Sequence, residues 1–194
     1  MTAIADRYRA HADAFERRVA GARPDQWSNP SPCQEWTARD VLRHIVDMHG
    51  AMLRPVGRQL SPAPSVEEDP LGAFVAARGD VEALLGDPAI ADLEIDSPGG
   101  ATTVARHIDE VISDDMVLHG WDLARATGQD DTLDPDDVAR IWAGTNAMPP
   151  AIMDMMRTPG AFGPGIVVFG PEVAVPADAP LRDRLLGLIG RDPH

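Results

Sequence analysis

The sequence predicts a mainly α-helical protein built around a four-helix bundle. Four long segments carry apolar residues at steps of three and four, which place them on one face of an α-helix. Capping residues, glycines or prolines stand close to the ends of these segments, as expected at helix termini. The four segments are residues 3–20, 37–54, 65–85 and 103–127. We expect a single domain over residues 1–194, with a C-terminal extension from residue 134.

Composition and charge exclude several classes of protein. The chain has 194 residues, of which 44% are hydrophobic, so it can bury a core and is not a disordered chain. Its net charge of -14 repels nucleic acid and anionic membranes, and we expect neither as a partner. No apolar run is long enough to span a bilayer and the N-terminus lacks a signal-peptide pattern, so we expect a cytoplasmic protein.

The first segment ends at Gly21 and carries His11 on its apolar stripe. We interpret His11 as a hydrogen-bonded core histidine, with contact to a central site as the alternative. The loop that follows holds the only cysteine, Cys33, so no internal disulfide is expected. We interpret Cys33 as a small buried hydrophobic residue, with a metal ligand or a nucleophile as the alternatives, because no convincing base or cation stands near it to activate the thiol.

The second helix is expected to begin after Thr37, a good N-cap with Asp40 three residues later. Pro55 closes this helix. His44 lies between apolar positions and is therefore predicted to point inward. His49 falls about a quarter-turn away and is predicted to lie at the flank or rim, with a role as metal ligand as the alternative.

A capping box of Ser65 and Glu68 predicts the start of the third helix. Arg78 lies near its middle, and we interpret it as solvated, with binding of an anionic substrate as the alternative. Residues 86–103 then alternate in polarity around a Ser-Pro-Gly-Gly turn at 97–100, which predicts a short hairpin or extended loop.

In the extension, Asp134 and Pro135 predict another helix start. The Met-rich segment 152–156 is interpreted as core rather than as copper ligands. Residues 166–169 predict a short strand or a buried extended segment, and a last helix is expected over 181–189.

The fourth helix carries charge where its apolar face should continue. Asp115, His119 and Asp122 follow apolar residues at helical spacing, and burying ionisable groups costs several kcal/mol unless they are paired. Asp115 and His119 would present two metal ligands on adjacent turns, and His44 would supply a third. Two imidazoles and a carboxylate suit zinc, with Ni(II) or Fe(II) as alternatives, and leave a coordination position open.

Two other interpretations of these residues stay open. Asp122 could orient an imidazole as a hydrogen-bond acceptor, or it could instead pair with Arg125 at the surface. Asp115 and His119 could also form a buried hydrogen-bonded pair with no metal at all.

Three segments carry a resemblance to a known family. They are Ser31–His44, Asp115–Gly128, and Phe169–Val173 together with Arg182, Leu185 and Gly190–Pro193. They resemble the mycothiol-dependent maleylpyruvate isomerase N-terminal family, the last stretch being similar to an actinobacterial metal-binding subfamily. The resemblance implies a DinB/YfiT-like four-helix bundle with a divalent metal held by histidines and a carboxylate.

Carried over, the family's metal ligands fall on His44, Asp115 and His119. The family usually has Glu at the acidic position, where this chain has the shorter Asp115. The isomerase itself carries a separate C-terminal domain that the extension does not resemble, so maleylpyruvate isomerisation is not carried over.

The resemblance implies thiol chemistry. We expect an enzyme of transferase or isomerase type that uses a low-molecular-weight thiol such as mycothiol, as a metal-bound thiolate, against a small electrophile. The alternative is a non-catalytic metal-binding sensor or protein-interaction module. A homodimer is the expected assembly, and no catalytic residue beyond the metal ligands is assigned.

Overall fold

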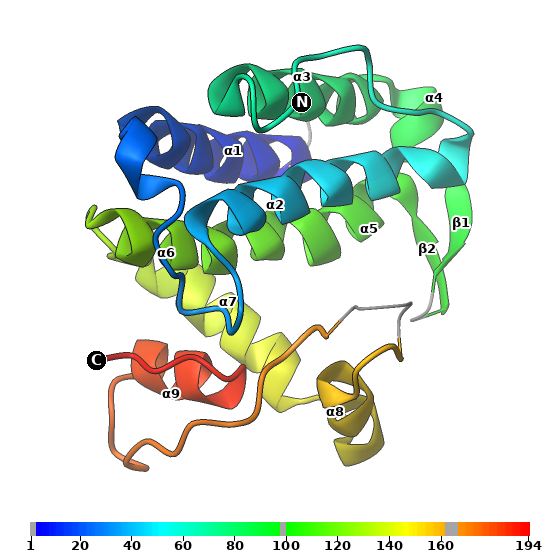
Figure 1. Cartoon of the computed structure of the whole chain (residues 1–194). Helices are drawn as coiled ribbons and strands as arrows, with labels where there is room; N and C mark the ends of the chain where they lie inside the picture. The colour runs from blue at the N-terminus through cyan, green and yellow to red at the C-terminus, as the bar shows by residue number, and fades with distance from the viewer. Residues whose placement is uncertain (1–2, 98–99, 162–166) are drawn as a thin grey trace. The chain divides into compact units, whose positions relative to one another are not determined.

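The computed structural model describes residues 3–97, 100–161 and 167–194 (Figure 1). It is mainly helical with one small two-stranded sheet, as the sequence predicts. The chain separates into two compact units, Met1–Ser31 with Trp36–Asp131, and Pro32–Glu35 with Thr132–His194. The single domain expected over residues 1–194 stays a prediction, and each unit is described by itself. No helix among the described residues is long and apolar enough to cross a membrane.

The first unit is a four-helix bundle, in agreement with the DinB-like fold expected from the sequence. Its helices are α1 (Ala3–Gly21), α2 (Ala38–Leu53), α3 (Pro70–Gly86) and a continuous fourth helix made of α5 (Val104–Ile108), η3 (Asp109–Ser113) and α6 (Asp114–Thr127). α2 packs against α3 and α6, and α1 packs against the same two helices (Figure 1). The largest fully buried side chains include Tyr8, Phe15, Leu42, Ile45, Phe74, Ile108, Ile112 and Trp121.

Short elements connect these helices. η1 (Pro24–Gln26) follows α1, η2 (Arg54–Val56) follows α2, and α4 (Pro88–Ala91) follows α3. The expected hairpin is confirmed as β1 (Glu94–Ser97) paired antiparallel with β2 (Gly100–Thr103). Residues 98 and 99 of its predicted turn lie outside the described residues. The Thr103 side chain then accepts a hydrogen bond from the backbone N–H of Arg106 and so caps α5.

The third helix begins five residues later than the sequence predicts. Ser65 and Glu68 do form the expected reciprocal hydrogen bonds, but they enclose a turn rather than a helix start. The N-cap is Asp69, whose side chain accepts from the backbone N–H of Gly72. Pro70 explains the difference, because the residue before a proline is disfavoured in the helical region and Asp69 is extended with φ -146°.

A π-helical turn interrupts the fourth helix at Asp109–Ser113. Such a turn holds one more residue than an α-turn, so it changes which side chains face the core downstream. Ile108, Ile112 and Met116 are buried at steps of four, whereas Val111 is only partly buried. Asp115 therefore lies at the edge of the core, with a side chain that is 25% exposed.

Arg78 is neither solvated nor free to bind an anion. Its guanidinium lies 2.8 Å from carboxylates of Asp13 and Glu82 and 2.7 Å from Glu16, and its side chain is only 15% exposed. Both sequence interpretations of this residue are wrong, because acidic residues of α1 converge on it from across the bundle. Arg78 instead links α1 to α3.

The second unit contains α7 (Pro135–Asn146), α8 (Pro150–Arg157) and α9 (Leu181–Leu188). Asp134 caps α7 as expected, accepting hydrogen bonds from two backbone N–H groups, and α7 packs against α9. The Met-rich helix α8 has no buried residue within this structure, and Met155 is 44% exposed. The interpretation of these methionines as core is therefore wrong.

The tail of the second unit runs over α9 without forming a strand in its described part. Ile166, the first residue of the predicted strand, lies outside the described residues, and Val168 is exposed. The backbone N–H of Val173 donates to the Gly187 carbonyl at 2.9 Å, a close approach that a side chain at Gly187 would block. In its described residues the tail is thus held by backbone hydrogen bonds to Met156 of α8, to Gly187 of α9 and to Ile189 rather than by a sheet.

His49 is fully buried in the bundle, so its predicted place at the rim is wrong. Its Nδ1–H donates to the Ile45 carbonyl at 2.6 Å, and its Nε2 accepts from the Tyr8 hydroxyl at 2.9 Å. Burial lowers the pKa of His49 to about 4, because the charged imidazolium would lose its hydration.

This burial predicts a stability that falls with acid. The unfolded chain binds a proton at His49 near pH 6.5 whereas the folded chain does not until about pH 4. Stability from this group is therefore complete above pH 6.5 and decreases by up to about 3 kcal/mol as the pH falls toward 4. Urea unfolding at pH 7 and 4.5 should show a smaller decrease for His49→Gln than for the wild type. His194→Gln, at the exposed C-terminus, is the control, and equal pH dependence of wild type and His49→Gln would contradict the expectation.

Candidate metal centre

The bundle brings together the three residues that the sequence selects as metal ligands. His44 comes from α2, and Asp115 and His119 lie four residues apart on α6. One potential ligand atom from each residue lies within 4.8 Å of the others. The contact between α2 and α6 is what closes the group, because His44 is far from the other two residues along the chain.

The Asp115 carboxylate lies between the two imidazoles. Its Oδ2 is 3.0 Å from His44 Nε2, and its Oδ1 is 3.8 Å from His119 Nε2. Atoms bound to one zinc ion at 2.0–2.2 Å in a tetrahedral site lie roughly 3.3 Å apart, a value between these two distances. The donor set of two nitrogens and one carboxylate oxygen therefore fits a divalent cation, and the shorter side chain of Asp115 reaches the site.

Asp122 holds the His119 ring through its other nitrogen. Its Oδ2 lies 2.8 Å from His119 Nδ1, and its side chain is fully buried. The Nδ1–H donates to this carboxylate, which leaves Nε2 with its lone pair toward Asp115. The structure therefore supports the role of Asp122 as the hydrogen-bond acceptor that orients an imidazole, rather than as a surface partner of Arg125. Arg125 lies 3.4 Å from Asp131.

Trp36 packs against both histidines and was not among the residues that the sequence pattern indicated. Its ring centroid is 5.5 Å from that of His119 with the planes 20° apart, and 5.0 Å from that of His44. Trp36 directly precedes Thr37, the N-cap of the helix that carries His44, and this position is the sequence feature that could have indicated its proximity to His44.

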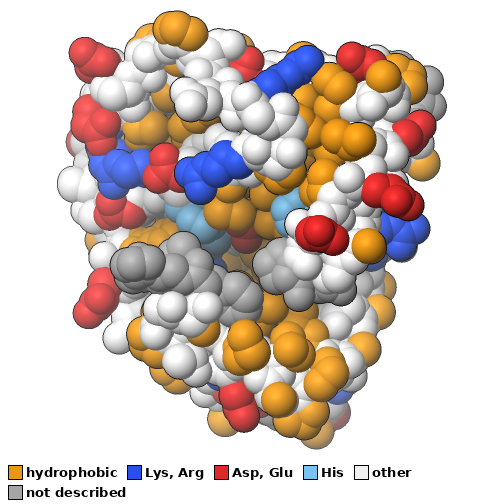
Figure 2. Space-filling view, turned by 90° about the vertical axis from the view of Figure 1, so that its right-hand side faces the viewer, with side chains coloured by type: hydrophobic (Ala, Val, Ile, Leu, Met, Phe, Trp, Pro, Cys, Tyr) orange, Lys and Arg blue, Asp and Glu red, His pale blue; other side chains and the backbone are white. Residues whose placement is uncertain are grey.

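Other candidate residues do not join this group within the described part of the chain. His11 is buried on α1, as the core interpretation predicts, and His49 bonds to Tyr8. Cys33 is partly exposed rather than buried. Figure 2 shows histidine side chains reaching the surface of one face, where acidic side chains are scattered rather than gathered in one patch.

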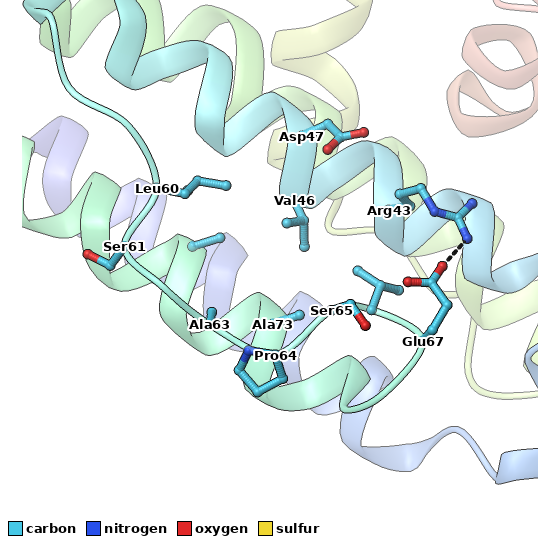
Figure 3. Close-up of a pocket in the computed structure, with 12 residues that line it drawn as sticks. Arg43, Val46, Asp47, Leu60, Ser61, Ala63, Pro64, Ser65, Glu67 and Ala73 are labelled. Carbon is cyan, nitrogen blue, oxygen red and sulfur yellow. Dashed lines mark hydrogen bonds and ion pairs between the residues drawn. The ribbon is translucent and has the colours of Figure 1, made fainter.

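A separate pocket of about 270 Å³ lies between α2, α3 and the segment at 60–67 (Figure 3). Its lining is mostly apolar and contains no histidine. Arg43 borders it and is paired with Asp40 and with Glu67, so its charge is already neutralised. This pocket is therefore not assigned to the metal centre.

Comparison with known proteins supports the expected resemblance over part of the chain. Residues 8–95 match the sequence model of the mycothiol maleylpyruvate isomerase N-terminal domain. The match includes His44 and ends before Asp115. Two uncharacterized proteins of Mycobacterium tuberculosis, from strains CDC 1551 and H37Rv, are each 29% identical over 179 residues, which is 92% of this chain and 92% of theirs. No solved structure gave a significant match.

Replacement of the buried partner of His119 should weaken metal binding. Asp122→Asn removes the charge that orients the ring, and loss of such partners typically lowers metal affinity by about 10–100-fold. Isothermal titration with Zn²⁺ would measure the change. Asp131→Asn makes the same change in net charge in an ion pair near the end of α6 and should leave the affinity unchanged. Equal affinities for the two variants would contradict a role for Asp122.

Proposed function

We propose that this protein is a metal-dependent enzyme that uses a low-molecular-weight thiol, such as mycothiol, in S-transfer or isomerisation. The observation that carries the proposal is the convergence of His44, Asp115 and His119 from two helices around one small volume. The match of residues 8–95 to the sequence model of a mycothiol-related family supports the choice of thiol. Zinc is the metal we expect, with Ni²⁺ or Fe²⁺ as alternatives.

The metal would supply one piece of chemistry, which is to lower the pKa of a coordinating thiol so that the thiolate predominates near neutral pH. The protein residues have their own tasks. Asp115 places a negative charge between the two imidazoles, which favours a cation there. Asp122 fixes the tautomer and direction of His119.

Access to the site is consistent with a small substrate. His44 and Asp115 side chains are 27% and 25% exposed, whereas His119 is buried. Three protein ligands leave a fourth position for a substrate, as in catalytic zinc sites. We infer that thiol and electrophile approach from the exposed side of His44 and Asp115.

A second candidate function is metal binding without catalysis, in a sensor or an interaction module. The net charge of -14 favours a basic protein partner for such a module. We propose a cytoplasmic location and a homodimer for either function, and the dimer can be tested by light scattering during size-exclusion chromatography.

Metal content tests the site. Untagged protein should carry close to one equivalent of metal by elemental analysis, and His119→Ala should lose it because the remaining two ligands hold the ion weakly. His107→Ala removes a histidine from the same continuous helix and should keep the metal. If His119→Ala retains the metal content of the wild type, the proposed centre is wrong.

Thiol transfer tests the activity. Zinc-loaded protein given mycothiol and monobromobimane or chlorodinitrobenzene should form the thioether adduct faster than metal-free protein does. The rate difference should disappear in His44→Ala. A zinc-loaded rate no greater than that of the metal-free control would favour the non-catalytic function.

A further inference from the structure

We propose that Trp36 is a positioning residue of the metal centre, which holds the rings of His44 and His119 in their ligating orientations and forms the apolar wall of the site. The inference rests on the proposed metal centre and adds a residue to it. Three aromatic rings meet there, because the ring centroids of His44 and His119 are themselves 4.7 Å apart.

His44 is the ligand that most needs this support. Rotation of an imidazole about its Cβ–Cγ bond is only weakly restricted by intrinsic rotamer preference. His119 has its Nδ1 bonded to Asp122, whereas the hydrogen bond of His44 to a described residue uses Nε2, the atom nearest Asp115. Metal binding through Nε2 would replace that bond. Packing against Trp36 would then be the contact that keeps the His44 ring in place.

The backbone of Trp36 is fixed relative to α2. Its carbonyl accepts from the N–H of Ser31 at 2.8 Å, and Pro30 and Thr37 form an isolated antiparallel bridge. Thr37 then caps α2 through its capping box with Asp40. The indole is therefore held at the start of the helix that carries His44.

The same loop is bonded to the end of α6. The Asn29 side-chain amide donates to the Ala126 carbonyl at 2.9 Å, and that of Gln26 donates to the Thr127 carbonyl at 2.6 Å. The carbonyl of Asn29 also accepts from the N–H of Ala38, the first residue of α2. The loop thus connects the two helices that supply the ligands, and Trp36 is placed with respect to both.

The residue before Trp36 is strained. Glu35 has φ +65°, in the left-handed region that non-glycine residues rarely adopt at a cost of roughly 1–3 kcal/mol. Such strain persists only where the surrounding structure demands it. The bend at Glu35 directly precedes the indole that contacts the two histidines.

Zinc affinity separates a positioning role from ordinary packing. If Trp36 only fills space, its truncation lowers stability but leaves the affinity of the folded protein unchanged. If it orients the ligands, Trp36→Ala should weaken zinc binding by about 10–100-fold, the range seen for residues that orient metal ligands. Trp36→Phe keeps an aromatic ring and should restore the affinity to within about threefold of the wild type.

Affinities would be measured by competition with a chromophoric chelator for the wild type, Trp36→Phe, Trp36→Leu and Trp36→Ala. Trp27→Phe is the matched control, because Trp27 lies in the same loop and contacts Arg39 instead of the histidines. Trp36→Leu keeps apolar volume without a flat ring and serves if Trp36→Ala does not fold, as judged by circular dichroism. The Trp36→Leu variant should bind zinc more weakly than the Trp36→Phe variant.

Fluorescence gives a readout that needs no activity. Co²⁺ quenches tryptophan emission at short range, so its binding should quench a smaller fraction of the emission in Trp36→Phe than in Trp27→Phe. The contribution of Trp121, two residues from His119, is common to both variants. If Trp36→Ala and Trp36→Leu bind zinc as tightly as the wild type while His119→Ala does not bind, the metal centre stands and the role of Trp36 is wrong. If the wild type binds no zinc, both proposals are wrong.

Discussion

The contact between the Asp115 carboxylate and His44 Nε2, 3.0 Å apart, is the interaction on which the rest of the site depends. It joins two helices of the bundle and brings a second imidazole to a carboxylate that already lies one turn from His119. Without this contact α6 would carry only an acidic residue and a histidine at a spacing that is common on helices. With it, three donors from separate parts of the chain share one small volume.

The residues around this contact differ in how deeply they are buried, and this difference has physical consequences. Asp122 is fully buried and satisfied by His119, so a change there disturbs a polar group that has no access to water. Asp115 and His44 are partly exposed and can exchange partners with solvent or a ligand at lower cost. The buried pair of Asp122 and His119 thus holds the His119 ring rigidly. The partly exposed side chains of Asp115 and His44 leave the site accessible to solvent.

The four-helix bundle also contains two polar side chains that take no part in the centre, His49, which is buried, and Arg78, which is largely covered. His49 lies in the core with both ring nitrogens bonded, which keeps it neutral, whereas Arg78 is surrounded by three carboxylates that keep it charged. The first group makes the fold sensitive to acid, and the second links α1 with α3. Neither arrangement depends on a metal.

The sequence by itself determined the presence of the bundle helices, the hairpin, and the capping of α2 and α7, because these follow from short-range periodicity and local hydrogen bonds. It also placed Asp115 and His119 on adjacent turns of one helix face. Only the tertiary structure decided which histidine of α2 faces the core and which faces the edge. His44 and His49 both lie among apolar neighbours, and their environments depend on how α2 packs against α3 and α6. The same holds for Trp36, whose loop is placed by hydrogen bonds to the far end of α6 that no local pattern reveals.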